Sequence, residues 1–174
     1  MQHRIIIIGT SCSGKSTLAK HLKKKLVIPH IEMDHLYWAP DWRPVLPGDF
    51  QQKVAMSVKS ESWIVDGNYS SVRDLIWPKA THVIWLDFPF YVVFWRAIKR
   101  VIRHLFHKTI FCNGNYETFN RVFLSKDSIL LWVIKTYWRR KISFTALLKK
   151  PEYRHLKVIH VRSPKKLKIY FEIK

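Results

Sequence analysis

One segment near the N-terminus constrains the fold of this chain more than any other, because it joins a strand to a helix through a loop of fixed composition. Arg4–Ile8 is an apolar run with the length of a buried strand, and Gly14–Leu26 has helical spacing, with leucines recurring along one side. The loop between them, Gly9-Thr10-Ser11-Cys12-Ser13-Gly14-Lys15-Ser16, fits the pattern G-x-x-x-x-G-K-[ST] at every fixed position. A strand, this loop and a helix in succession predict an α/β fold.

The composition of the loop predicts a cradle for the phosphates of ATP. Glycines allow a tight turn, the loop N–H groups converge on phosphate oxygens, and the start of the helix adds the positive end of its dipole. Lys15 is expected to reach the β- and γ-phosphates, and the Ser16 hydroxyl to coordinate Mg²⁺. The expected nucleotide-binding residues of this loop are Gly9, Thr10, Ser11, Cys12, Ser13, Gly14, Lys15, Ser16 and Thr17.

The rest of the chain alternates strands with helices, which predicts a parallel sheet within one domain over residues 1–174. Further strands are expected at Ile31–Met33, Trp63–Val65, His82–Leu86 and Lys157–Val161. Helices are expected at Asp49–Ser60, with Asp49 as N-cap, at Ser70–Ile76, at Pro89–Phe106, within Glu117–Lys150 and from Ser163-Pro164 onward, and Asp34–Pro47 is expected to be loop-like. Three tryptophans on apolar faces, Trp85, Trp95 and Trp132, are expected in the core, whereas isolated histidines such as His30 and His160 are interpreted as structural or exposed.

Two acidic residues, Asp66 and Asp87, each end an apolar strand. Ligands of open α/β folds bind at this edge of the sheet, so one of the two carboxylates is expected to hold Mg²⁺, directly or through water. Asp87 follows the apolar run Val-Ile-Trp-Leu, and Asp66 precedes Gly67-Asn68, which lets a ligand approach. Both residues remain candidates, and a helix-capping role is the alternative for each.

Basic residues mark two later helices. Arg96, Arg100, Arg103 and His107 recur at helical spacing with Lys99 beside them, which suits charge stabilisation in phosphoryl transfer or, alternatively, a solvated face. Arg139-Arg140-Lys141 forms a second cluster. It either closes on the same site or compensates a helix dipole.

The net charge of +19 is uneven, since residues 1–87 contribute +3 and residues 88–174 contribute +16. A basic half attracts polyanions, which include nucleotides, nucleic acid and acidic lipid. The two cysteines, Cys12 and Cys112, form no disulfide framework, and we expect a reducing, cytoplasmic environment with no secretory signal and no membrane span.

These features together resemble the adenylate-kinase-like P-loop proteins labelled DNA topology modulation protein, within the nucleoside-monophosphate and shikimate kinase group. The resemblance covers most of the chain. It rests on the loop Gly9–Ser16 and on Met33–Trp38, Trp63–Ser70, Leu86–Pro89, Trp95–Arg100, Asn113–Asn115 with Glu117, Ser128–Trp132 and Arg162–Pro164. Only the loop is specific for chemistry, and the other stretches point to the subfamily.

The resemblance implies a three-layer fold, with a five-stranded parallel sheet in the order 2-3-1-4-5, helices on both faces and a helical lid insertion at about 103–118. It implies that Arg96 and Arg100 grip the phosphates and that the Asp66-Gly67 turn lies beside the acceptor with Asn68. Asp34 is placed on the acceptor and Arg73 on its phosphate, while Arg162 and Pro164 belong to the loop around adenine.

The chain departs from the family pattern on the acceptor side. No arginine follows Asp34, and Tyr37, Trp38 and Trp42 occupy that region instead, which disfavours AMP as the acceptor. These rings are expected to stack on a base or sugar of the substrate, and a hydrophobic plug over the sheet edge is the alternative. The expected activity is transfer of the γ-phosphoryl group of Mg·ATP to a small nucleotide or hydroxyl acceptor, with Lys15, Arg96, Arg100, Asp66 and Asp34 as catalytic residues. The alternative is an ATP-switched nucleic-acid-binding protein that uses the basic half.

Overall fold

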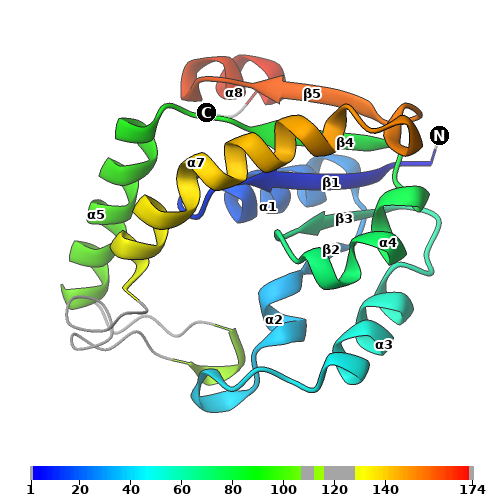
Figure 1. The fold of residues 1–174 in the computed structure, drawn as a ribbon, viewed down its shortest axis with the longest axis horizontal. Helices are drawn as coiled ribbons and strands as arrows, with labels where there is room; N and C mark the ends of the chain where they lie inside the picture. The colour runs from blue at the N-terminus through cyan, green and yellow to red at the C-terminus, as the bar shows by residue number, and fades with distance from the viewer. Residues whose placement is uncertain (1, 107–111, 116–127, 173–174) are drawn as a thin grey trace.

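The computed structural model describes residues 2–106, 112–115 and 128–172, and it forms an α/β sandwich around one sheet (Figure 1). All strand pairs are parallel, and their order β2-β3-β1-β4-β5 confirms the predicted order. The strands are β1 (Arg4–Gly9), β2 (His30–Glu32), β3 (Trp63–Asp66), β4 (His82–Leu86) and β5 (Lys157–Val161). Gly9, Leu86 and Val161 pair in register, so the carboxyl ends of β1, β4 and β5 form one edge.

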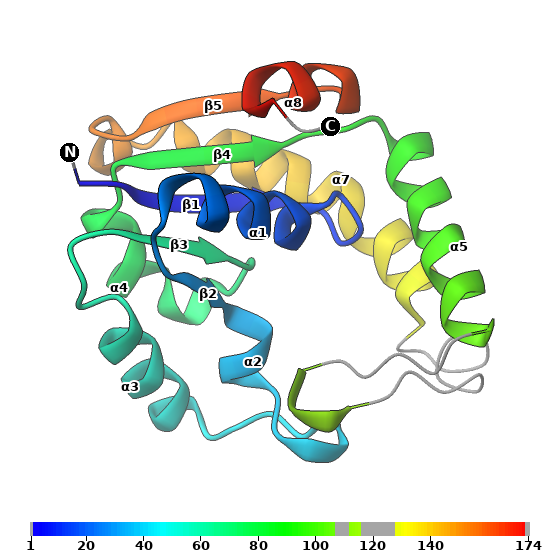
Figure 2. The ribbon, with the colours of Figure 1, turned by 180° about the vertical axis from the view of Figure 1, so that it is seen from behind.

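Helices cover both faces of the sheet, as predicted (Figures 1 and 2). They are α1 (Lys15–Leu26), α2 (Met33–Tyr37), α3 (Pro47–Ser57), α4 (Arg73–Ile76), α5 (Phe90–Phe106), α7 (Ile129–Leu148) and α8 (Pro164–Phe171). Short 3₁₀ turns lie at Pro40–Trp42, Ser70–Val72, Trp77–Lys79, Cys112–Gly114 and Pro151–Tyr153.

Strand β1 divides the core in two because its side chains alternate across the sheet. Ile6 and Ile8 pack on the side of α3, α4 and the C-terminal half of α7. Ile5 and Ile7 pack on the side of α1, α5 and α8, where the N-terminal half of α7 also contributes. Helix α7 therefore reaches from one core to the other, and this path carries it past the carboxyl edge of the sheet.

Several predicted boundaries were wrong. Segment 34–47 is not simply a loop, since it contains most of α2 and the turn Pro40–Trp42, and α2 takes Met33 from the expected strand. Helix α3 begins at Pro47 with Leu46 as its N-cap, so Asp49 lies inside the first turn and does not cap it. Proline suits the first helical position, because its missing N–H would have no partner there.

The tryptophan prediction was right only in part. Trp85 is 6% exposed, but Trp95 and Trp132 are 56% and 44% exposed, because α5 and α7 turn other residues inward. The inward residues include Val93 and Ala97 on α5 and Val133 on α7. Of the expected lid at 103–118, residues 107–111 and 116–118 lie outside the described residues.

Candidate functional site

The loop after β1 has the backbone of a tight anion cradle. A Cβ atom on Gly9 would lie 2.8 Å from both the Leu86 carbonyl oxygen and the Ser13 Oγ, and Gly14 has φ 99°. Cys12 has φ 63°, which places a left-handed residue within the turn closed by the Ser13 N–H on the Thr10 carbonyl at 3.1 Å. Neighbouring residues in right-handed and left-handed conformations turn successive N–H groups toward one point, so the loop can bind an anion.

Lys15, the first residue of α1, folds back over this loop. Its Nζ donates hydrogen bonds to the carbonyl oxygens of Gly9 and Thr10, each at 3.2 Å. Burial lowers the pKa of Lys15, and so does the neighbouring charge of Arg140, while Asp66 and Asp34 act in the opposite direction. Two cations and two carboxylates therefore lie within electrostatic reach of one another at the loop.

Arg96 reaches the loop from α5. Its Nη1 donates to the Ser13 carbonyl at 2.8 Å, and its guanidinium lies 5.0 Å from the centre of the Phe88 ring. Burial lowers the pKa of Arg96. Arg100 lies one turn further along α5 and is half-buried, while Arg103 is exposed.

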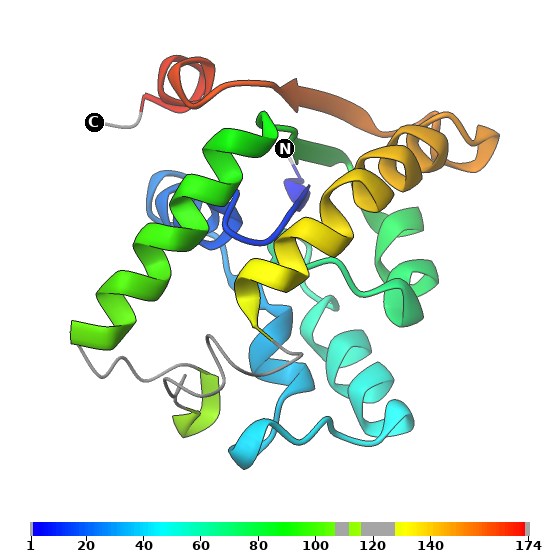
Figure 3. The same cartoon turned by 60° about the vertical axis from the view of Figure 1, so that its left-hand side comes forward.

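A second arginine reaches the loop from α7, and the sequence had left its role open. Arg140 Nη1 donates to the Ser11 Oγ at 3.3 Å, and its guanidinium is 5.5 Å from the Trp132 ring. Burial lowers the pKa of Arg140, with a further contribution from Arg139. Figure 3 shows α5 and α7 on either side of the loop between β1 and α1, so the site gains one arginine from each helix.

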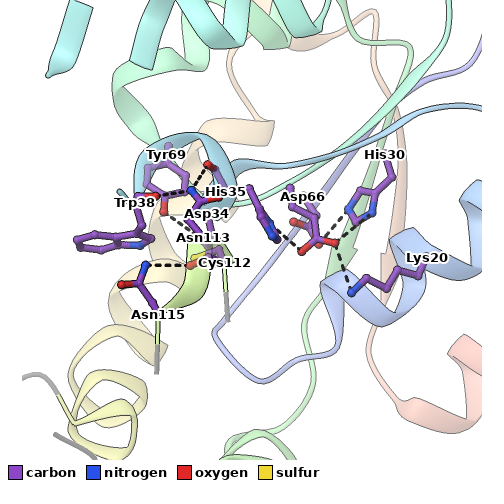
Figure 4. A network of polar contacts seen from close by, with 11 residues as sticks. Lys20, His30, Asp34, His35, Trp38, Asp66, Tyr69, Cys112, Asn113 and Asn115 are labelled. Carbon is purple, nitrogen blue, oxygen red and sulfur yellow. Dashed lines mark hydrogen bonds and ion pairs between the residues drawn. The ribbon is translucent and has the colours of Figure 1, made fainter. Parts of the chain in front are cut away.

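Asp66 lies at the carboxyl end of β3 and is 5% exposed. Burial by itself raises the pKa of Asp66, but His30, a hydrogen bond from Ser16 and the charge of Lys15 outweigh it and lower the pKa. His30 Nε2 is 3.4 Å from Asp66 Oδ2 in the polar network of Figure 4. No periodicity or motif in the sequence pairs His30 with this carboxylate.

Asp87 has other partners. Its Oδ1 is 3.3 Å from Lys141 Nζ, and its Oδ2 is 3.0 Å from His160 Nε2. The His160 ring in turn stacks on Trp85 at 4.2 Å. The structure thus brings Asp66 together with Ser16 and ties Asp87 to α7 and β5.

The surroundings of Asp66 fit a magnesium ion. Its Oδ2 is buried and has no hydrogen-bond partner among the described residues, although it has an ion-pair contact with His30. A buried carboxylate oxygen beside a serine hydroxyl is suited to Mg²⁺, which takes few protein ligands and completes its shell with phosphate oxygens and water.

On the expected acceptor side, Asp34 is exposed on α2 and accepts a hydrogen bond from the Tyr69 hydroxyl at 2.6 Å. Burial raises the pKa of Tyr69, and Asp34 raises it further, so this hydroxyl stays a donor. The rings of Tyr37 and Tyr69 are 4.8 Å apart, and Trp38 meets Tyr37 edge-on at 4.8 Å. An aromatic wall therefore stands beside the Asp34 carboxylate.

A turn from the expected lid docks on this wall. Asn113 Nδ2 donates to the carbonyl oxygens of His35 at 2.9 Å and Trp38 at 2.6 Å. Asn115 Nδ2 donates to the Ala39 carbonyl at 3.0 Å, and its Oδ1 accepts from the Trp42 N–H at 2.8 Å. Figure 4 shows Cys112, Asn113 and Asn115 beside Asp34 and Trp38.

The remaining expected residues lie at varying distances from this centre. Asn68 is engaged with the backbone, since its Nδ2 donates to the Gly9 carbonyl at 2.6 Å and its Oδ1 accepts from the Gly9 N–H at 3.5 Å. The Arg73 guanidinium is 6.0 Å from the Trp77 ring, beside a cavity of about 20 Å³. Arg162 is exposed after β5, and Pro164 is the first residue of α8.

The fold is shared with solved structures, although no protein-family model matches the sequence and no curated protein matches it either. A gluconokinase from Sinorhizobium meliloti 1021 is similar with a TM-score of 0.53 and 17% identity, over 98% of this chain and 89% of that one. An uncharacterized protein from Eubacterium ventriosum is similar with a TM-score of 0.51 and 14% identity, over 99% and 97% of the two chains. The chain therefore has a P-loop kinase-like fold.

Proposed function

We infer that the protein is a P-loop phosphotransferase that moves the γ-phosphoryl group of ATP to a small acceptor. The observation that carries this inference is the convergence of Lys15, Arg96 and Arg140 on one loop, with Asp66 and Ser16 at its base. Three cations from three helices around an anion cradle suit a reaction in which negative charge spreads over transferring phosphate oxygens.

Each residue has a distinct role in this proposal. The loop N–H groups and Lys15 bind the triphosphate, and Arg96 and Arg140 stabilise the charge that develops at the migrating group, with Arg100 joining them. Ser16 and Asp66 would hold Mg²⁺, which neutralises charge on the phosphate oxygens when bound. Asp34 orients the acceptor, because it is exposed on α2 while its carboxylate lies near Lys15 and Arg140.

The acceptor is a nucleotide or a hydroxylated molecule, and Tyr37, Trp38 and Tyr69 provide rings against which a base or a sugar ring packs. The similarity to the gluconokinase does not identify gluconate as the acceptor of this chain, because an identity of 17% supports the fold alone. Arg73, Arg162 and Pro164 are assigned to the outer parts of the acceptor and adenine sites.

The test is ATP turnover, measured as ADP release over a panel of nucleosides, nucleoside monophosphates and hydroxylated metabolites. Lys15→Ala and Arg140→Ala should each lower kcat by on the order of a hundredfold or more. The matched controls are Lys23→Ala, an exposed lysine of the same helix α1, and Arg139→Ala, the exposed neighbour on α7. Full turnover in Lys15→Ala would disprove the proposal.

Nucleic-acid binding through the basic half remains a competing function. Loose binding to duplex DNA that vanishes near physiological salt is expected of a chain with this charge. Tight binding that resists salt and responds to ATP would favour the switch instead of the kinase.

A further inference from the structure

Helix α7 is apolar on two sides, and only one of them packs into the core. Its inward side buries Val133, Tyr137, Phe144 and Leu147. On the outer side, four residues recur at steps of three and four, as one face of a helix requires, and each is between 40% and 69% exposed. These residues, here called the α7 stripe, are Leu131, Ile134, Trp138 and Ile142.

Helix α5 packs beside the α7 stripe and also exposes apolar residues. The Trp138 ring lies 4.8 Å from Phe90 of α5, which connects the stripe to that helix. The outer side of α5 exposes Tyr91, Trp95 and Ile102, with exposed fractions of 72%, 56% and 46%. Isolated exposed apolar residues are normal in proteins, but an aromatic and aliphatic set over two packed helices marks an interaction surface.

The charged residues within the two helices have one sign. Neither Phe90–Phe106 nor Ile129–Leu148 contains an acidic residue. Lys135 and Arg139 flank the α7 stripe and are exposed, and the Lys99 ammonium lies 5.4 Å from the Trp95 ring. Exposed tryptophan and tyrosine with lysine and arginine beside aliphatic side chains are typical of helices that lie in a bilayer interface.

We propose that the outer faces of α5 and α7 dock on an anionic lipid surface, with the α7 stripe entering the interface and Lys135 and Arg139 at the headgroups. A second copy of the chain is a poor occupant, because a symmetric contact would bring like charges together. Nucleic acid uses cations and stacking aromatic rings, and it gives Leu131, Ile134 and Ile142 no partner.

Lying on a membrane does not require crossing it. None of the helices in the described part of the chain is long and apolar enough to span a bilayer. The proposed mode is therefore peripheral, and it combines apolar burial with attraction to acidic headgroups.

The experiment is co-sedimentation with vesicles of equal parts phosphatidylcholine and phosphatidylserine, compared with pure phosphatidylcholine. Because a net charge of +19 attracts any anionic surface, the decisive measurement is made at high salt, where charge attraction is screened. The double variant Trp138→Ser with Ile142→Ser should then lose roughly tenfold or more of the partition coefficient.

The matched control is Ile169→Ser with Tyr170→Ser on α8, where the two side chains are 68% and 61% exposed. It removes an equally exposed isoleucine and an aromatic residue from another helix and should retain binding, while thermal melting confirms that both variants fold.

The proposal is overturned if the wild-type chain fails to sediment with the anionic vesicles, or if both double variants lose binding equally. It is also overturned if the stripe variant abolishes a lipid-free dimer, or tight duplex DNA binding, and leaves vesicle binding unchanged.

Discussion

Asp66 and Asp87 have equivalent positions in the sequence, each after an apolar strand, yet the folded chain gives them different partners. The Ser16 hydroxyl helps to lower the pKa of Asp66, and His30 contacts its Oδ2, whereas Asp87 pairs with Lys141 and His160. Both environments hold the carboxylates with cationic or donor groups, but Ser16 and Lys15 of the loop act on Asp66. We therefore propose Asp66 as the residue that would hold Mg²⁺.

The lowered pKa of Asp66 predicts a pH dependence of stability. The folded chain keeps the pKa of Asp66 below its ordinary value of 3.8, so the unfolded chain takes up the proton first as the pH falls. The stabilisation from Asp66 is therefore complete at neutral pH and is lost below about pH 4, as the pH falls through the folded pKa. In Asp66→Asn, the free energy of unfolding in urea should fall less steeply over that acidic range.

The same variant separates the two aspartates in activity. Asp66→Asn should reduce ATP turnover by on the order of a hundredfold, while Asp87→Asn should act mainly on stability. Loss of turnover in Asp87→Asn with normal turnover in Asp66→Asn would reverse the assignment.

At the scale of elements, the turn Cys112–Gly114 and the neighbouring Asn115 join the segment after α5 to α2. Asn115 is 3% exposed. Its Nδ2 donates to the carbonyl oxygens of Ala39 and Cys112, and its Oδ1 accepts from the Trp42 N–H. Asn113 serves two further carbonyls but is exposed. Because Asn115 is buried, water does not replace its hydrogen bonds to these groups when its side chain is removed.

Asn115→Ala should lower the free energy of unfolding by about 1–3 kcal/mol, because buried polar backbone groups lose their partner. Asn113→Ala should cost less, since water replaces its bonds. Because the turn supports the Asp34–Trp42 wall, KM for the acceptor should rise in Asn115→Ala more than KM for ATP. Urea unfolding and steady-state kinetics test this, and equal costs in the two variants would contradict it.

The sequence was most informative about elements whose signal is local. The strand, loop and helix over Arg4–Leu26 and the strands His82–Leu86 and Lys157–Val161 were predictable, because apolar runs and glycine positions determine them directly. The short helix α2 was not, since its five residues are held by packing against α3 and by the docked turn. Arg140 and His30 could not be placed for the same reason, because only the packing of α7 and β2 brings them to the loop and to Asp66.

Over the whole molecule, binding of nucleotide should be visible as stabilisation. At about a hundred times its Kd, Mg·ATP should stabilise the fold by about 2.7 kcal/mol, which raises Tm by roughly 5–11 °C in a chain of this size. Lys15→Ala and a sample with ATP and EDTA should show a smaller rise, because each lacks part of the site. Scanning fluorimetry checks this, and an unchanged Tm in the wild-type chain with Mg·ATP would contradict nucleotide binding.

The bracing of the loop also bears on how fast a ligand is captured. Lys15, Arg96 and Arg140 hold the loop through hydrogen bonds to Gly9, Thr10, Ser13 and Ser11. The loop therefore loses its conformational entropy when the chain folds, and the triphosphate binds to a rigid loop. To bind, the triphosphate must displace the Lys15 ammonium from two carbonyl oxygens. This displacement, rather than ordering of the backbone, should therefore set the barrier to association.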